Sequence, residues 1–248
     1  MVSKTILFAL AAAPFVAAHG KVASVVGDLG GNGTALAIQG GVVPGPGPNR
    51  KTELDTTVFK SKNIMTDGMG KTTGGGKVQA ADITQAMALS GDTLPQVSST
   101  GGNITGVFHV VTTDGAGPLR AVLDTTGTGQ FAQGTELQVL QQVPGKGGNI
   151  RPNGQVPGGR RSLWERAMSV IEKRASNVNM DFPMAFAVPA GTACTGSMGG
   201  QENVCLVKIA NSNGAGPFGG VVPIQIAANG AATPAATPAA KREVEFKA

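Results

Sequence analysis

Short apolar runs and polar turns alternate along most of the chain. Segments such as VFHVV and LRAVLD are rich in β-branched residues and are bounded by glycine, proline, asparagine and aspartate. Many short strands of this kind favour an all-β domain with long loops. The first strand begins at residue 19, and we expect Val22, Val25 and Val26 to point partly inward. The other expected strands cover residues 107–111, 119–124, 136–143, 182–188, 203–212 and 221–227.

One segment departs from this pattern and predicts an amphipathic helix over about residues 162–175. Ser162 and Glu165 stand three residues apart, which is the spacing of a capping box. The apolar residues of this segment share one helical face: Leu163, Trp164, Ala167, Met168 and Ile171. Charged residues occupy the opposite face, so we expect the helix to cover a sheet or a loop.

The first 18 residues have the three parts of a secretory signal peptide. Lys4 is the positive start, residues 6–13 are an unbroken apolar run, and Val16 and Ala18 form a small-residue cleavage pattern. Cleavage after Ala18 would make His19 the first residue of the mature protein. No later stretch reaches the ~20 apolar residues of a membrane span. We therefore expect a secreted protein, extracellular or associated with a cell wall, without a membrane partner.

The other end of the chain also differs from the body. From residue 229 the sequence has many small residues, repeated ATP triplets and terminal charges. This composition predicts a disordered, O-glycosylated tail over residues 229–248. Residues 19–228 then suit a single domain.

Composition narrows the possible partners. Lys and Arg number 20 against 15 Asp and Glu, and these charges are scattered rather than interleaved with aromatic residues. This distribution argues against nucleic acid as a partner. The two cysteines, Cys194 and Cys205, predict one disulfide in a secreted chain. Acceptor triplets at Asn32 and Asn103 predict N-glycosylation on surface loops.

The chain contains only two histidines, His19 and His109. A histidine at a free N-terminus offers its α-amine and its ring Nδ1 to one metal ion, and a second histidine on a neighbouring strand adds a third nitrogen. Such a set favours copper, because Cu(II) prefers tetragonal nitrogen and oxygen ligands whereas zinc prefers four tetrahedral ligands. Alternation places His109 on the strand face opposite Phe108 and Val110. A histidine packed in a core would have the same sequence surroundings, so both interpretations stay open at this point.

Several of these motifs resemble known families. The N-terminal HG, a histidine strand followed by DGAGP, and a last segment with GPFGG and a P-x-Q pattern resemble the histidine-brace copper proteins, the lytic polysaccharide monooxygenases and their relatives. The block CTGSMGGQENVCLVKIANSNGAGPFGGVVPIQ is more similar to the fungal appressorium-specific secreted proteins of the MAS/Egh type. These are virulence factors that plant pathogens express at penetration. The resemblance runs from about His19 to Ile226.

The resemblance implies an immunoglobulin- or fibronectin-III-like β-sandwich with one copper ion on a flat exposed face. His19 would provide the amine and Nδ1, and His109 would provide Nε2. Phe218 would lie beside the axial copper position, because the chain has no tyrosine. Gln225 would be the hydrogen-bonding residue that positions the oxygen species.

On this basis we expect a monomeric copper-dependent monooxygenase that takes electrons from an external donor and oxidises a cell-wall polysaccharide such as chitin, chitosan or cellulose. Two other functions stay open. The same histidines could hold copper without oxidase chemistry, and a non-catalytic virulence protein of the infection-cell surface would need no copper. The chain has nine Phe, one Trp and no Tyr, which argues against an aromatic-lined glycan platform.

Overall fold

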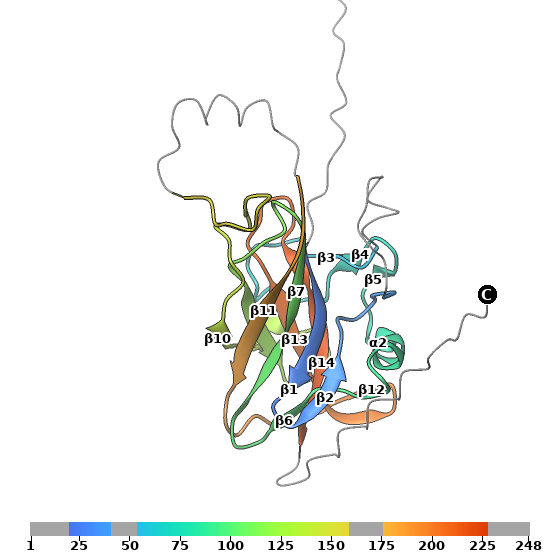
Figure 1. Ribbon diagram of the computed structural model, residues 1–248. Helices are drawn as coiled ribbons and strands as arrows, with labels where there is room; N and C mark the ends of the chain where they lie inside the picture. The colour runs from blue at the N-terminus through green and yellow to red at the C-terminus, as the bar shows by residue number, and fades with distance from the viewer. Residues whose placement is uncertain (1–19, 41–53, 159–175, 228–248) are drawn as a thin grey trace, which may run out of the picture.

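The apolar runs of the sequence form strands in two β-sheets that pack face to face (Figure 1). The computed structural model describes residues 20–40, 54–158 and 176–227. The strands are β1 (Gly20–Gly27), β2 (Gly30–Gly33), β3 (Thr57–Val58), β4 (Lys71–Thr72), β5 (Gly76–Lys77), β6 (Gln96–Ser98), β7 (Gly102–Thr112), β8 (Arg120–Asp124), β9 (Thr135–Glu136), β10 (Gln138–Gln141), β11 (Asn177–Val188), β12 (Gly196–Met198), β13 (Gln201–Ala210) and β14 (Phe218–Ala227). The described helices are η1 (Ala80–Asp82), α2 (Ile83–Leu89) and η2 (Phe131–Gln133).

The first sheet has five antiparallel strands in the order β10-β11-β7-β1-β2. Its centre is β7, which pairs over most of its length with β1 on one side and β11 on the other. The second sheet has the order β5-β4-β3-β14-β13-β8-β9, with β12 added to β13 and β6 paired in parallel with β14. The prediction of an all-β fold is confirmed as two sheets of mainly antiparallel strands. The immunoglobulin- or fibronectin-III-like strand order stays a prediction.

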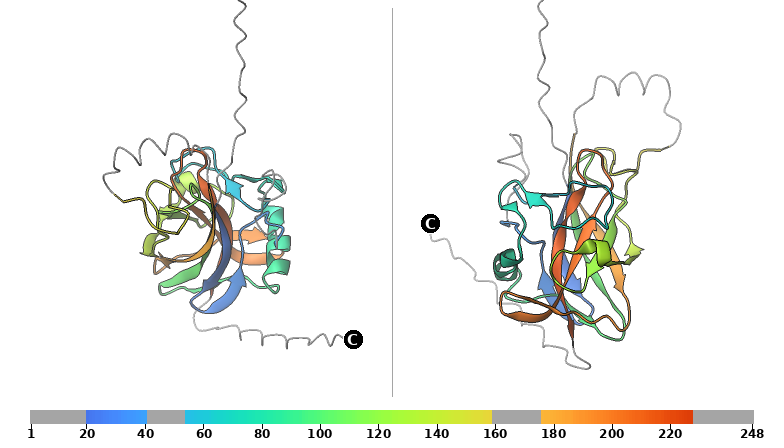
Figure 2. Two further views of the ribbon diagram at one scale, coloured as in Figure 1. Left: turned by 45° about the horizontal axis from the view of Figure 1, so that its top comes forward. Right: turned by 180° about the vertical axis from the view of Figure 1, so that it is seen from behind.

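Two apolar clusters hold these layers together. The first lies between the sheets and includes Phe108, Val110, Phe186 and Val222. The second lies on the outer side of the second sheet, where α2 and neighbouring loops cover it (Figure 2). Because β13 contributes to both clusters, residues 204–210 are buried without a break. A nearly continuous apolar run of this kind, here interrupted by Lys208, is expected for a strand buried on both faces.

The first strand differs from the expectation in one residue. Val22 and Val25 are buried, but Val26 is 37% exposed. The pairing of β1 with β7 shifts by one residue between Val22 and Ser24. Such a bulge inserts an extra residue and so moves the inward positions that follow it. Val26 therefore points outward, and the expected inward orientation is wrong for this residue.

The segment at residues 136–143 is two strands and not the single expected strand. β9 pairs with β8 in the second sheet, whereas β10 pairs with β11 in the first. The chain changes sheets at Leu137, which is buried and donates its N–H to the carbonyl of Ala121. Alternation alone does not reveal such a crossing, because both halves keep the same polar and apolar pattern.

The helix expected at residues 162–175 lies outside the described residues, as do the signal peptide and the tail. The structure instead shows α2, which the sequence pattern did not predict. This helix has only seven residues and buries Ile83 and Ala86 against the second cluster. So short a helix is stabilised by packing rather than by its own propensity.

The other covalent predictions have different outcomes. Cys194 and Cys205 form the expected disulfide, with Cα atoms 5.1 Å apart. The glycosylation acceptors are not on loops: Asn32 is an exposed residue of β2 and Asn103 is a half-buried residue of β7.

None of the helices in the described part of the chain has the length and apolar character that crossing a bilayer requires.

Candidate functional site

His109 lies near one end of β7, between one charged residue on each neighbouring strand. Its Cα pairs with Lys21 of β1 and with Asp181 of β11. Residues directly opposite each other on paired strands point to the same face, so these three side chains form a row. Phe108 and Val110 point the other way into the core and are fully buried, as alternation predicts. The row therefore lies on the outer face of the first sheet.

The two ring nitrogens of His109 have different surroundings. Nδ1 lies 2.6 Å from Oδ1 of Asp181. A carboxylate only accepts hydrogen bonds, so Nδ1 is the donor, and the neutral tautomer that makes this bond has its lone pair on Nε2. Nε2 is buried and has no hydrogen-bond partner in the described part of the chain. A ring held by a carboxylate with its other nitrogen unpartnered is the arrangement of a metal-binding histidine.

The start of β1 approaches this histidine closely. Gly20 pairs with Val110, one residue from His109. A Cβ atom at position 20 would meet the carbonyl oxygen of Gly115 and would lie 2.5 Å from the ring of Phe108. Only glycine fits here, because any side chain would displace the backbone. His19 lies outside the described residues, but it is bonded to Gly20.

Charged residues surround the row. The Nζ atom of Lys21 lies 3.4 Å from Oδ2 of Asp55, whose side chain is buried. Asp55 also accepts the backbone N–H groups of Gln39 and Gly40 at 2.6 and 3.1 Å. In the turn after β7, burial raises the pKa of Asp114 above its usual range, against a hydrogen bond from Thr112 that lowers it.

The described residues do not form a complete metal site. No group of three His, Cys, Asp or Glu side chains within them is arranged to hold an ion. His109 contributes one open nitrogen, and Asp181 is used to orient it. The amine and imidazole of His19 would be needed to complete a three-nitrogen set.

The structure places Gln225 away from this site. Gln225 pairs with Gln96, and Gln96 lies against Gly27 at the far end of β1. Lys21, which neighbours His109, is six residues from Gly27, a separation of roughly 20 Å along a strand. The Gln225 side chain instead accepts from Gln96 Nε2 at 2.7 Å and donates to the carbonyl of Glu202 at 2.8 Å. The prediction that Gln225 positions oxygen at the copper site is therefore wrong in this structure.

Phe218 lies at the same end of the sandwich as Gly20 but on the other side of the first sheet. A Cβ atom at Gly220 would lie 3.3 Å from Val22, so this part of β14 faces the interior. Phe218 is two residues earlier, shares that face and is 1% exposed. His109 points to the outer face. The prediction that Phe218 is the axial neighbour of the metal is wrong, because Phe218 lies between the sheets, away from the face that carries His109.

Sequence reasoning missed Asp181 and Lys21. Asp181 is 72 residues from His109, and only the register of β7 with β11 brings the two together. No local motif marks either residue. The sequence did contain one local signal of a close approach to β7. It is Gly20, which directly follows the histidine at the expected cleavage site.

Comparison with known proteins relates most of the chain to one family. The profile of the family described as "Egh16-like virulence factor" matches residues 17–219. The chain is 37% identical over 238 residues to the appressoria-specific virulence factor GAS1 of Pyricularia oryzae, covering 95% of this chain and 80% of the relative. It is 30% identical over 279 residues to GAS2 of the same fungus, covering 89% of this chain and 87% of the relative. No solved structure matches the chain significantly.

Proposed function

The chain belongs to the Egh16-like virulence factor family, and we propose that it is a secreted virulence factor of the appressorium that holds one copper ion. The appressorial role follows from the names of its two relatives. The copper site would use the amine and Nδ1 of His19 together with Nε2 of His109. A copper ion bound there would supply redox chemistry or would simply be sequestered.

One observation carries the copper proposal. Nε2 of His109 is buried without a hydrogen-bond partner among the described residues, although burying a polar atom without a partner is costly. A metal ion would satisfy this nitrogen. Asp181 supports the same assignment, because a carboxylate on Nδ1 orients the ring and raises the basicity of Nε2.

Continuation of the β1–β7 register would support the rest of the site. Gly20 pairs with Val110, so residue 19 would stand opposite Val111, on the face that carries His109. Diagonal neighbours on one sheet face have Cα atoms about 7–8 Å apart, within reach of two imidazole rings around one ion.

Copper binding without oxidase chemistry is the first candidate, because Gln225 and Phe218 do not lie at the site. Oxidation of a cell-wall polysaccharide with an external electron donor is the second candidate. It is favoured by the position of the row on an outer face, where the side chain of Asp181 is 68% exposed and a polymer could approach.

The decisive experiment is a Cu(II) titration of the natively processed protein. A variant with one extra alanine before His19 serves as the matched control, since it keeps every side chain but moves the free amine. We expect one tight site in the native form, with three nitrogen ligands in its electron paramagnetic resonance spectrum. The extended variant and His109→Ala should each weaken binding by at least about 100-fold. Equal binding by the native and extended forms would refute the site.

Product analysis separates the two candidates. The copper-loaded protein is incubated with a polysaccharide, a reductant and hydrogen peroxide, and His109→Ala is treated in parallel. Oxidised oligosaccharides that appear only with the native protein would establish the enzyme. Tight copper binding without such products would leave the non-catalytic copper protein.

A further inference from the structure

The end of the sandwich that holds Gly20, His109 and Phe218, here called the histidine end, is rich in exposed cations. Six exposed cations lie at this end: Lys60, Lys62, Lys71, Lys77, Lys146 and Arg151. None of them forms an ion pair with an acidic residue in the described ranges. The close contacts between basic and acidic side chains within those ranges involve Lys21, His109 and Arg120 instead.

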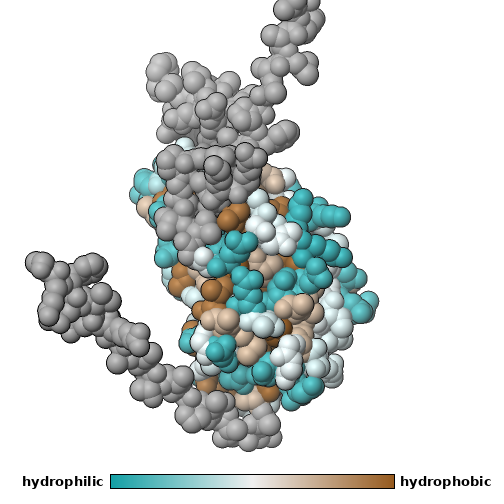
Figure 3. Space-filling model, turned by 90° about the vertical axis from the view of Figure 1, so that its right-hand side faces the viewer, coloured by the Kyte–Doolittle hydropathy of each residue, from teal (hydrophilic) through white to brown (hydrophobic). Residues whose placement is uncertain are grey.

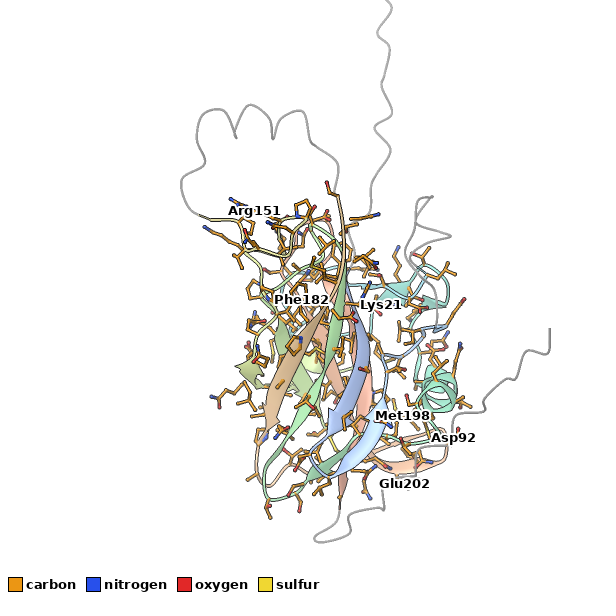
Figure 4. All side chains as sticks on the ribbon, viewed as in Figure 1. Lys21, Asp92, Arg151, Phe182, Met198 and Glu202 are labelled. Atoms are coloured by element: carbon orange, nitrogen blue, oxygen red, sulfur yellow. A yellow bond between two sulfur atoms is a disulfide. The ribbon has the colours of Figure 1, made fainter. Side chains whose placement is uncertain are left out.

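The fold explains why these cations collect at one end. Lys60 and Lys62 follow β3, which pairs with the first two residues of β14. β4 and β5 extend the same sheet beyond β3. Gly145, next to Lys146, packs against Gly117 in the loop that follows β7. In Figure 4, Arg151 and Lys21 lie toward this end, whereas Asp92 and Glu202 lie toward the other.

The acidic groups at the histidine end offset only part of this charge. Asp55 is buried against Lys21, and Glu136 is paired with Arg120. Asp181 accepts a hydrogen bond from His109. Burial raises the pKa of Asp114, which disfavours its charged form. Asp67 is an exposed carboxylate that accepts the N–H of Ala132.

Two of the lysines are placed so that their charges lower the stability of the sheet. Lys71 of β4 and Lys77 of β5 are directly opposite each other in the hairpin. Like charges in directly paired positions repel and destabilise a sheet. An anionic partner that bridges the two ammonium groups would convert this repulsion into attraction.

The described surface has few features that bind neutral sugars. The exposed large apolar residues within the described ranges are aliphatic, and five of the six phenylalanines there are buried. Neutral polysaccharides such as chitin and cellulose are usually held by stacking on exposed aromatic rings, and the cationic chitosan would be repelled. Hydrophilic and hydrophobic residues are interspersed over the side that carries α2 (Figure 3).

We propose that the histidine end binds an anionic polysaccharide, namely a polymer of uronate sugars whose carboxylates contact Lys60, Lys62, Lys71, Lys77, Lys146 and Arg151. This inference rests on the proposed secretion to the cell surface but does not require copper. Attraction between a cationic face and a polyanion is long-ranged and is screened by salt.

The test uses the full mature protein treated with a chelator, so that failure of the copper site and failure of this surface are distinguishable. Retardation in native gels containing polygalacturonate is compared with retardation in carboxyl-reduced polygalacturonate and in soluble neutral glucan. We expect retardation only by polygalacturonate, and its loss between about 0.05 and 0.5 M salt. The double variant Lys71→Gln/Lys77→Gln should weaken binding by about tenfold or more, because each lysine near an anionic surface contributes severalfold.

A matched control changes the net charge equally at the other end. Ala190→Glu/Asn203→Asp adds two negative charges at exposed positions far from the histidine end and should change binding by less than about twofold. Equal weakening by both double variants would show that only net charge matters and would overturn the proposal. It would also be overturned by equal retardation in neutral glucan, or by phosphatidylserine vesicles or duplex DNA competing as strongly as polygalacturonate.

Discussion

The most quantitative prediction concerns Lys208, a lysine buried on the outer side of the second sheet. Its side chain emerges from β13 and is 2% exposed. Nζ donates to the carbonyl of Thr66 at 2.7 Å and lies 4.8 and 5.1 Å from the ring centroids of Phe59 and Phe131. Burial lowers the pKa of Lys208 from 10.5 to about 8, although the charge of Asp67 opposes this shift.

The sign of the resulting pH dependence follows from proton binding in the two states. Above pH 8 the folded protein begins to release this proton, whereas the unfolded chain keeps it until about pH 10.5. The unfolded state therefore binds more protons in this window, and the free energy of unfolding rises with pH. A shift from 10.5 to about 8 corresponds to roughly 3 kcal/mol, and most of this is gained by pH 10.

Urea unfolding of the wild type and of Lys208→Met at pH 7, 8, 9 and 10 measures this effect. The chain suits the experiment because it has no tyrosine and no free cysteine to titrate in the same range. We expect the stability of the wild type relative to Lys208→Met to rise by about 2 to 3 kcal/mol between pH 7 and pH 10. Lys77→Met, which removes an exposed lysine, should keep the slope of the wild type.

The reasoning fails if the stability difference between wild type and Lys208→Met does not change with pH. Such a result would mean that the hydrogen bond to Thr66 and the two aromatic rings compensate fully for the loss of water around the ammonium group. A loss of stability with pH relative to Lys208→Met would show that the charged form is the favoured one in the folded state.

Three other predictions concern the site and the fold. Asp181→Asn should lower copper affinity by about 10- to 100-fold, measured by competition with a chelator, because His109 loses its orienting carboxylate; unchanged affinity would remove Asp181 from the site. Gln225→Ala should leave copper affinity within about twofold of the wild type, since that residue lies at the far end of β1, and a large loss would contradict this placement. Replacing both Cys194 and Cys205 by serine should reduce the free energy of unfolding, measured in urea, by about 3 kcal/mol, because the bridge closes a loop between residues 11 apart. A change under about 1 kcal/mol would show that the unfolded chain gains little conformational freedom when the bridge is absent.

The candidate site shows which features local residue patterns can predict. The pattern around His109 correctly predicted a strand and the side of the sheet to which the ring points. It did not predict Asp181, because the two residues meet only through the register of β7 with β11. Gln225 was assigned to the site from a motif, but the length of β14 carries it to the opposite end of the sandwich.

In the fold, too, local features were predictable from the sequence and the pairing of distant strands was not. The apolar runs around β7, β8, β11, β13 and β14 were visible as strands, because burial imposes alternation or a continuous apolar segment on the sequence. The bulge in β1 and the change of sheet at Leu137 were not visible. Both depend on which strand pairs with which, and pairing leaves no local signal in a single strand.

The sequence by itself determined the all-β class, the strand segments, the disulfide and the two histidines as candidate ligands, because these follow from local composition and periodicity. Only the tertiary structure decided which residues surround His109 and that six cations without an acidic partner among the described residues share its end of the molecule. The physical reason is that a strand pair joins residues far apart in the chain. Which charges meet there depends on register and strand order, and these are set by the packing of the whole core.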